Sequence, residues 1–489
     1  MFFMLAEAAQ QAGFDAPMVA ALDAGFAGLI AEVQALRAQL PTPVAARGFE
    51  LALEAQLRAC GRALVEWAYH HLEPPAPQVV ARGRVHRFVN VSPRRGGLDT
   101  LFGTVPLARR VYRRADGANR NVLAPLDHWL GVVHCRASPA LAERIAAAAA
   151  ERTQGETLAW LARDHGVRWN AGQLRRAVRT LAKELEPQRL EVAAARLRAL
   201  LEQARKSKGR QRPTLALGRD GVMVPAVGGA CQEAAAATLT VYDRRGRRLG
   251  TVYLGRMYEF RQETLSRQAT ELLDRVLRAW SGPLPRLCYV TDCGSHPRDY
   301  WRDVLRTMKH PVTGAKLAWI RVVDFYHAGT YVTKLGEALF GAGRGAGWVR
   351  TMRHALRHDP RGVACVLRSA AAHRRERREW TAAQEKLYRE GTRYLRKHRR
   401  WMNYRALKNA GLPIGSGVTE AACKTVFAQR LKRSGMRWTI AGGQAVVDLR
   451  TLKLSGLLAP AYARALAARA LPQTCTAAET GSSHFGNAA

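Results

Sequence analysis

Beyond residue 213 the sequence alternates short apolar runs with amphipathic stretches in a fixed order. Short apolar runs bounded by turn residues predict strands, and apolar residues at three- and four-residue spacing predict helices. The expected elements are strands over 214–219, 236–242 and 249–254, a helix over 264–280, a strand over 287–291, a helix over 300–308 and a strand over 318–323. This is the element order of the ribonuclease-H-like fold, an α/β architecture whose mixed sheet places the first and fourth strands side by side.

Three of these predicted strands end in an acid. Asp220 follows the first strand, Asp292 the fourth and Asp324 the fifth. A fourth acid, Glu420, is expected in the first turn of a helix that Ser416 caps. If the first and fourth strands are neighbours, Asp220 and Asp292 meet at one edge of the sheet although they are far apart in the sequence.

Carboxylates gathered in this way suit metal-dependent phosphodiester chemistry. Two divalent cations about 4 Å apart can activate a nucleophile and neutralise charge at the attacked phosphorus. Mg²⁺, for which Mn²⁺ can substitute, keeps several waters and needs few protein carboxylates. We expect Asp220 and Asp292 to share one ion and Glu420 to complete the second site. The structural alternatives are a turn role for the aspartates and a helix-dipole role for Glu420.

The charge balance indicates which substrate such a site would meet. The chain has 77 Lys and Arg residues against 39 Asp and Glu residues, a formal net charge of +38. A field of this sign attracts polyanions, and binding of that kind weakens with salt. A high-GC genome, which favours arginine codons, accounts for part of the excess. Nucleic-acid binding is the interpretation that we favour for the remainder.

Cysteine usage and hydropathy bear on the cellular compartment. The eight cysteines form no Cys-x-x-Cys pair, which argues against a structural zinc site and is consistent with a reducing cytoplasm. The N-terminus lacks the basic start of a signal peptide. We expect no apolar run of the ~20 residues that a membrane span needs, and therefore a cytoplasmic bacterial protein, associated with the nucleoid when bound to DNA.

Changes in composition along the chain predict several regions. They are an N-terminal helical region at 1–75, a small β-containing region with a hairpin at 76–135, a mainly helical DNA-binding region at 136–205, the first part of the core at 213–327, a helical insertion at 328–412, the last part of the core at 413–460 and a C-terminal tail at 461–489. The basic stretch 206–213 is the clearest boundary. The two strands of the hairpin are expected over 82–91 and 103–112.

Residues 138–185 are typical of three short helices, of which the third carries Arg175, Arg176 and Arg179. A further connecting helix is expected over 188–206. A helix, a turn with Gly166 and a basic helix resemble a DNA-binding helix-turn-helix. An ordinary three-helix packing unit with solvated arginines fits the same pattern, and the sequence leaves both possibilities open.

Basic residues also follow the last acid closely. If Glu420 binds metal, this cluster is placed to hold DNA near the site: Lys424, Arg430, Lys432, Arg433, Arg437 and Trp438. Trp438 is as easily a packing residue as a base-stacking one. Asp324 and His327, three residues apart, are candidate accessory contacts to metal or DNA, or a local hydrogen bond at a strand-to-helix junction.

With these residues in place, the sequence resembles a DDE-type bacterial insertion-sequence transposase of the ISKra-like group. The blocks that carry the resemblance, over about 80–460, are Asp220-Gly221, Val290-Thr291-Asp292, Asp324-Phe325-Tyr326-His327-Ala328, Pro413-Ile414-Gly415-Ser416-Gly417-Val418-Thr419-Glu420-Ala421-Ala422-Cys423-Lys424, and Arg430-Leu431-Lys432-Arg433-Ser434-Gly435-Met436-Arg437-Trp438. One departure is Asp292-Cys293-Gly294, where Asp-Gly is more usual in such proteins.

The resemblance implies a catalytic triad of Asp220, Asp292 and Glu420, dependence on Mg²⁺, and cleavage and strand transfer at terminal inverted repeats. The implied partners are double-stranded DNA, both repeat ends and target, and further copies of the chain in a synaptic complex. Two other functions remain open. One is a non-catalytic or domesticated sequence-specific DNA-binding protein. The other is a structure-specific nuclease of the same fold.

Overall fold

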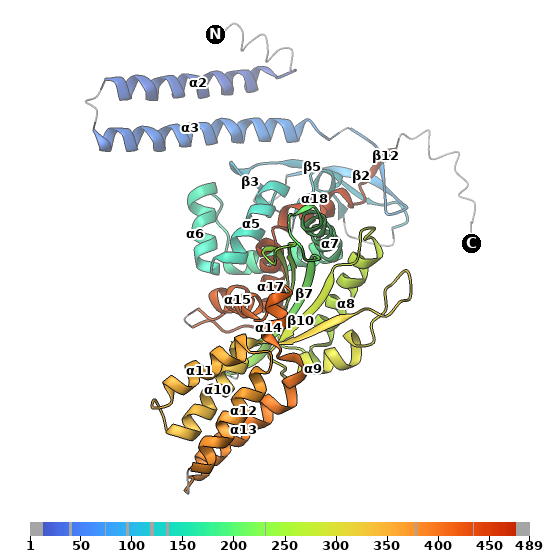
Figure 1. Ribbon diagram of the computed structural model, residues 1–489. Coiled ribbons are helices and arrows are strands. Elements are labelled where there is room, and N and C mark those ends of the chain that lie inside the picture. Colours follow the sequence, from blue (N-terminus) through green and yellow to red (C-terminus); the bar gives the residue numbers. More distant parts are fainter. Residues whose placement is uncertain are drawn as a thin grey trace. The chain divides into compact units, whose positions relative to one another are not determined.

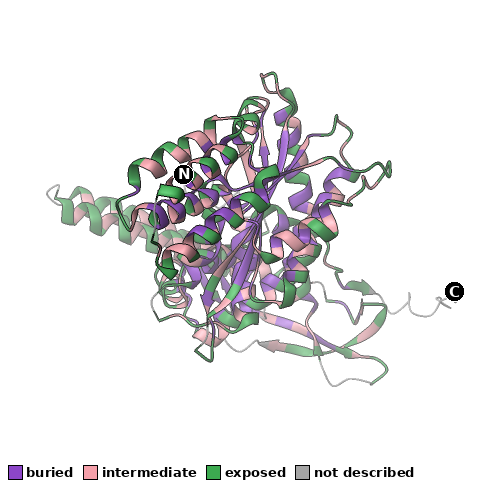
Figure 2. Ribbon diagram, turned by 60° about the horizontal axis from the view of Figure 1, so that its bottom comes forward, coloured by how far each residue is buried: buried purple, intermediate pink, exposed green. Residues whose placement is uncertain are grey.

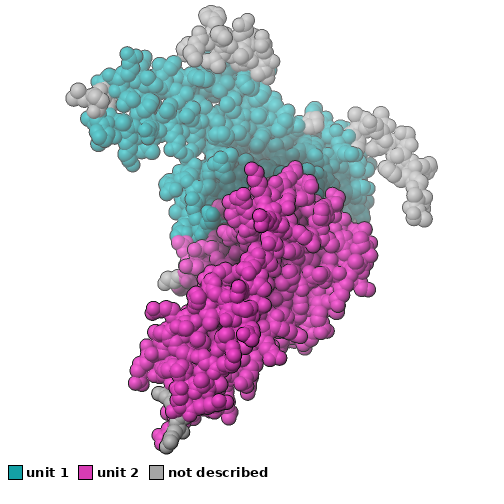
Figure 3. Space-filling view, in the orientation of Figure 1, with its two compact units in different colours: residues 1–181, 462–489 teal, residues 182–461 magenta. Residues whose placement is uncertain are grey.

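The computed structural model describes residues 13–38, 42–73, 75–93, 97–117, 122–133, 136–229, 231–376, 379–433 and 435–475. The chain forms two compact units (Figure 3). Unit 1 consists of residues 1–181 and 462–489, and unit 2 of residues 182–461. The expected boundary at 206–213 therefore lies inside unit 2.

Unit 1 begins with two paired helices, α2 (Ala16–Arg37) and α3 (Pro43–His70) (Figure 1). Gly25 permits close contact, because a Cβ there would lie 2.3 Å from the Sγ atom of Cys60. Among the described residues, α2 alone is long and apolar enough to cross a membrane, by length and composition only. The expectation that no run reaches this length was wrong, because the many alanines of α2 keep the mean hydropathy high despite Asp23 and Glu32. Core helices and signal sequences share this property, so it is weak support for a membrane span.

The sheet of unit 1 has the strand order β12-β1-β2-β5-β6. The strands of unit 1 are β1 (Gln78–Ala81), β2 (Arg84–Pro93), β5 (Ala108–Arg114), β6 (Val122–Leu123) and β12 (Gln473–Cys475), with a separate pair of β3 (Leu98–Thr100) and β4 (Gly103–Val105). The run expected over 103–112 is divided into β4 and β5 at Pro106, which cannot donate a ladder hydrogen bond. The expected tail contributes β12, which pairs antiparallel with β1.

The helices that follow in unit 1 are α4 (Pro125–Trp129), α5 (Pro139–Glu151), α6 (Gln154–His165) and the start of α7 (Ala171–Lys206). The sequence predicted two helices where α7 is one, because Pro187 lies inside it without ending it. A proline removes one backbone hydrogen bond, whereas buried residues on both sides, such as Leu185 and Val192, anchor the helix in the core. Packing therefore overrides the local signal, and α7 runs from unit 1 into unit 2.

Unit 2 contains a five-stranded mixed sheet with the order β11-β10-β7-β8-β9. Its strands are β7 (Thr214–Pro225), β8 (Cys231–Tyr242), β9 (Arg248–Arg256), β10 (Arg286–Thr291) and β11 (Trp319–Val323). β7, β8 and β9 are antiparallel neighbours, whereas β10 is parallel to both β7 and β11. The prediction that the first and fourth strands of this sheet are adjacent is confirmed by the β7–β10 pairing.

The helix expected over 264–280 forms at 263–278, whereas the one expected over 300–308 lies earlier, at 295–305. Two helices beyond residue 439 were not predicted, and the second of them enters the expected tail at 461–489. The helices of unit 2 thus match the prediction in part. They are η1 (Phe260–Gln262), α8 (Glu263–Arg278), α9 (Ser295–Tyr300), η2 (Trp301–Leu305), α10 (Phe325–Phe340), α11 (Ala346–His358), α12 (Gly362–Glu376), α13 (Ala382–His398), η3 (Arg399–Trp401), α14 (Tyr404–Asn409), α15 (Gly417–Ala422), η4 (Cys423–Ala428), α16 (Gln429–Leu431), α17 (Ile440–Leu454) and α18 (Leu458–Ala467), the last of which ends in unit 1. Within 328–412, the described residues form helices and no strand, as the helical insertion predicts.

Buried residues concentrate along the strands of the sheet and the helices against it (Figure 2). One face of α8 supplies Leu265, Leu272 and Leu273, all with no exposed surface. The helical insertion packs around Val332, Leu335 and other apolar residues of α10 to α14, and this core extends to Val323 of β11 and to Cys293. The sheet edge that carries the predicted acids therefore rests on a packed layer, with the insertion starting directly after β11.

Candidate active site at the strand ends

Asp220 and Asp292 occupy matching positions on neighbouring parallel strands. In the ladder between β7 and β10 the last paired residues are Gly218 and Val290. Asp220 follows Gly218 by two residues, and Asp292 follows Val290 by two residues. Both side chains are half-buried and line one cavity of about 250 Å³. The expectation that these two acids meet at one edge of the sheet agrees with this geometry.

The hydrogen-bond partners of these two carboxylates are neutral groups. The Oδ1 atom of Asp220 accepts a hydrogen bond from the N–H of Gly221 at 2.8 Å, and that of Asp292 accepts one from the N–H of Gly294 at 2.9 Å. Burial raises the pKa of Asp220, and the nearby charge of Asp292 raises it further, while the Gly221 N–H opposes the shift. Acids brought together without a basic partner favour a bound cation, which relieves their repulsion.

Glu420 lies in the first turn of α15, as predicted, and its side chain is exposed. Ser416 does not cap the helix through its side chain; its Oγ atom instead donates a hydrogen bond to the Oε1 atom of Glu420 at 2.8 Å. Although the side chain as a whole is exposed, partial desolvation of its carboxyl end is the first cause of the raised pKa of Glu420; the hydrogen bond from Ser416 opposes the shift, and the charges of Asp324 and Asp220 add to it. Glu420 therefore lies within electrostatic reach of Asp220 but is not among the residues that line the 250 Å³ cavity.

The three predicted acids do not converge on one point in this conformation. Among the described residues, no three His, Cys, Asp or Glu side chains are placed to hold a metal ion together. Asp220 is the acid that interacts with both of the others. The charge of Asp292 raises the pKa of Asp220, and the charge of Asp220 raises the pKa of Glu420. Two carboxylates facing one cavity fit a single Mg²⁺, which keeps most of its waters. The donor set for a second ion is not assembled here.

Asp324 has a local structural role. Its side chain is fully buried and caps α10, with Oδ1 accepting from the N–H of Tyr326 and Oδ2 from that of His327. The same Oδ1 atom accepts a hydrogen bond from the N–H of Ser416 at 3.1 Å. His327 contacts the rings of Tyr331 and Tyr394 edge-on. Of the two alternatives for this pair, the structure contains the hydrogen bond at the junction.

The basic cluster after Glu420 divides into exposed and buried members. Exposed side chains belong to Lys424, Lys432, Arg433 and Arg437. Arg430 is only 2% exposed and lies over the ring of Trp438, so the prediction that it contacts DNA is corrected to a packing role. Trp438 donates through Nε1 to the carbonyl of Leu431 and is half-buried, which places it among the packing residues too.

In unit 1, the helices of the predicted helix-turn-helix form as expected. α6 ends at His165 and is capped by Gly166, which has a left-handed backbone with φ of 64°, and α7 begins after Asn170. Asn170 and Gln173 exchange hydrogen bonds between side chain and backbone at this start. Three exposed side chains project from the first turns of α7, those of Arg175, Arg176 and Arg179.

Several polar residues that line the cavity escaped the sequence analysis, namely Glu233, Gln262, Ser295 and His296. Glu233 precedes the apolar part of β8, and Gln262 lies in a short turn before α8. Only the pairing of β7 with β8 brings Glu233 near Asp220, so no local sequence pattern predicts that Glu233 belongs to the cavity.

Comparison of the chain with protein-family models gives no match, and comparison with curated proteins gives no significant relative. The case for any function therefore depends on the residues of the chain and their arrangement.

Proposed function

We propose that this protein is a DDE-type DNA transposase that cleaves DNA at insertion-sequence ends and transfers the strands to a target. The observation that carries the proposal is the placement of Asp220 and Asp292, which end neighbouring parallel strands and line one cavity. A chain with net charge +38 brings polyanionic DNA to such a site.

The sheet supports a ribonuclease-H-like core as part of this proposal. The order β11-β10-β7-β8-β9, with three antiparallel strands followed by two parallel ones, is the arrangement that such a core requires. The helical segment between β11 and α15 corresponds to an insertion placed before the last acid. Glu420 then follows the insertion at the start of a helix, close enough to Asp220 for their charges to interact.

The residues of the cavity are suited to hold a divalent cation. Asp220 and Asp292 would bind Mg²⁺, which neutralises charge on a phosphate and lowers the pKa of bound water. The N–H groups of Gly221 and Gly294 orient the two carboxylates, so little reorganisation is needed on binding. Glu420 completes the set only after its side chain leaves Ser416, a change that its exposed position permits.

Surface cations supply the remaining DNA contacts in this proposal. Lys424, Lys432, Arg433 and Arg437 are exposed on the segment that follows Glu420, and Lys or Arg side chains of this kind bind phosphates. The exposed arginines of α7 are the candidates for reading the terminal inverted repeats. Joining two ends in one synaptic complex would need at least two copies of the chain.

A non-catalytic DNA-binding protein is the second candidate. The contact between Ser416 and Glu420 favours it, because it holds the third acid outside the cavity that contains Asp220 and Asp292. In this alternative the acids stabilise the fold only, and the basic surfaces carry the whole function.

A cleavage assay on DNA from the flanks of the gene tests the proposal. Purified protein is incubated with end DNA and with scrambled DNA of equal length, in Mg²⁺, in Mn²⁺ and in a chelator. Nicks at the ends together with joined products support a transposase, and nicks in branched DNA without joining indicate a structure-specific nuclease. Specific binding without any nick in either metal would reject the catalytic proposal in favour of the second candidate.

A further inference from the structure

The cavity beside Asp220 and Asp292 contains a third acid. Glu233 lies on β8, opposite Met223 of β7, and its side chain lines the same cavity. Gly221 leaves the space that this carboxylate occupies, because a Cβ at residue 221 would lie 2.0 Å from the Oε1 atom of Glu233. Of the residues that line the cavity, three are therefore carboxylates, and Glu420 is not one of them.

Gln262 holds Glu233 in this position. Its Nε2 atom donates a hydrogen bond to the Oε1 atom of Glu233 at 3.3 Å, and its Oε1 atom accepts one from Arg219 at 2.9 Å. Since a guanidinium only donates, the oxygen of the Gln262 amide must face Arg219 and its NH₂ group must face Glu233. The direction of the amide is thus fixed by chemistry.

Arg219 is itself rigidly held, with 1% of its surface exposed. It donates a hydrogen bond to the Oγ atom of Ser266 at 2.9 Å, and its guanidinium lies 4.6 Å from the ring centre of Tyr300. Ser266 and Tyr300 are neutral. The hydrogen bond from Arg219 to Gln262 therefore links the buried positive charge of Arg219 to the acids of the cavity.

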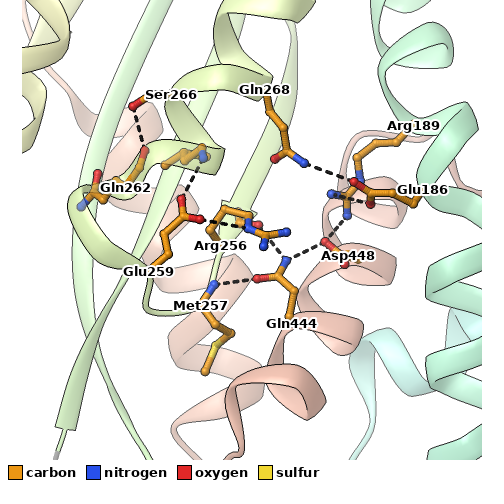
Figure 4. Close-up of polar contacts among 12 residues, drawn as sticks. Glu186, Arg189, Arg256, Met257, Glu259, Gln262, Ser266, Gln268, Gln444 and Asp448 are labelled. Atoms are coloured by element: carbon orange, nitrogen blue, oxygen red, sulfur yellow. Dashed lines mark hydrogen bonds and ion pairs between the residues drawn. The ribbon is translucent and has the colours of Figure 1, made fainter.

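The backbone at Gln262 is strained. Arg261 and Gln262 have φ values of 52° and 53°, a left-handed conformation that is costly for residues other than glycine. Figure 4 shows the polar contacts that hold this turn between β9 and α8. They join Glu259 to Arg256 and to the N–H of Leu265, Gln444 to the N–H of Met257 and to Asp448, and Ser266 to the carbonyl of Gln262. The surrounding structure therefore enforces the strained turn that places the Gln262 side chain at the cavity.

We propose that Glu233, oriented by Gln262 and Arg219, is a positioning residue that strengthens divalent-cation binding by Asp220 and Asp292. Because no three acids among the described residues converge on one point, Glu233 acts through the charge and hydration of the cavity, and Asp220 and Asp292 remain the direct ligands. This inference rests on the proposed function, since it assigns a residue to the same site.

The test is a Mn²⁺ titration of the full chain without DNA, followed by electron paramagnetic resonance of the free ion. The Glu233→Gln variant keeps an acceptor for Gln262 but removes the charge, and its Kd for Mn²⁺ should rise roughly 10-fold, as for outer residues of metal sites. Glu263→Gln is the matched control, because Glu263 is exposed in the first turn of α8 and is not among the residues that line the cavity.

A second variant tests position without changing any charge. Gly221→Ala should displace the flexible end of Glu233 and raise the Kd by a similar factor, with a melting curve that stays close to that of the wild type. Gly347→Ala is its control, because a Cβ at residue 347 meets no atom within 4 Å. Wild-type Mn²⁺ affinity in both Glu233→Gln and Gly221→Ala would overturn the inference.

Failure of the inference about Glu233 and failure of the proposed function give different results. A wild-type protein that binds Mn²⁺ with the expected dependence on Glu233, but never nicks end DNA, keeps this inference and rejects the proposed function. If the wild-type protein nicks end DNA but substitution of Glu233 leaves the Kd for Mn²⁺ unchanged, the proposed function is kept and this inference is rejected. A wild-type protein that neither binds Mn²⁺ nor nicks end DNA rejects both.

Discussion

The Oδ1 atom of Asp324 accepts a hydrogen bond from the backbone N–H of Ser416, 92 residues later in the chain. Asp324 directly follows β11 and caps α10, the helix that leads into the insertion, and Ser416 directly precedes the helix of Glu420. The segments that flank the insertion are therefore joined at the buried carboxylate of Asp324, and Ser416 lies four residues before the third candidate acid, Glu420.

This relationship predicts that Asp324 serves stability more than cation binding. Asp324→Ala removes the acceptor of three backbone N–H groups and should lower the free energy of unfolding by roughly 2–4 kcal/mol. Urea unfolding measures the loss. The comparison is Asn403→Ala, which removes the simple cap of α14 and should cost about 1 kcal/mol. Unchanged stability with lost Mn²⁺ binding would instead make Asp324 a ligand.

Asp292→Asn should abolish cleavage while DNA binding stays nearly intact. The change removes one ligand of the proposed cation and leaves the exposed basic residues in place, so the cleavage rate should fall at least about 100-fold. Gel-based nicking and binding assays on the same end DNA report the two effects separately. Near-normal nicking by this variant would count against the site.

Replacing Arg175 and Arg176 together by Ala should weaken binding to end sequences by about 10-fold more than binding to random DNA. Both side chains are exposed at the start of α7, where a recognition helix contacts bases. Fluorescence anisotropy with the two DNAs at one salt concentration measures the ratio. An equal loss for both DNAs would assign these arginines to general phosphate binding and favour the three-helix packing unit.

Asp220→Asn should stabilise the protein at pH 7.5 in the presence of a chelator. Burial, followed by the charge of Asp292, raises the pKa of Asp220 above its ordinary value of 3.8. The folded state therefore binds this proton more tightly than the unfolded chain, and the related stability is present below pH 3.8 and is lost as the pH rises through the raised pKa. The gain in Tm should shrink between pH 7.5 and pH 4.5, whereas a constant difference would point to another cause.

Much of unit 2 was predictable because its signals are local. The apolar runs that became β7 and β10 are short and bounded by turn residues, and parallel neighbours necessarily share an edge for Asp220 and Asp292. The continuous α7 was missed because its buried residues on both sides of Pro187 outweigh one lost hydrogen bond.

The rest of the site depends on distant contacts. Asp324 was left ambiguous because one of its donors, Ser416, lies across the insertion. Arg430 was assigned to DNA because a basic residue within a basic cluster gives no sign of burial. Glu233 was missed because only the register of β7 with β8 brings it to the cavity.

The pairing of β12 with β1 has a consequence for the way this chain is made. β1 is translated early, whereas its antiparallel neighbour β12 leaves the ribosome only after the whole of unit 2 has been translated. Unit 2 can thus fold while the sheet of unit 1 still has an open edge. β12 then pairs with β1 and covers the edge that β1 leaves open.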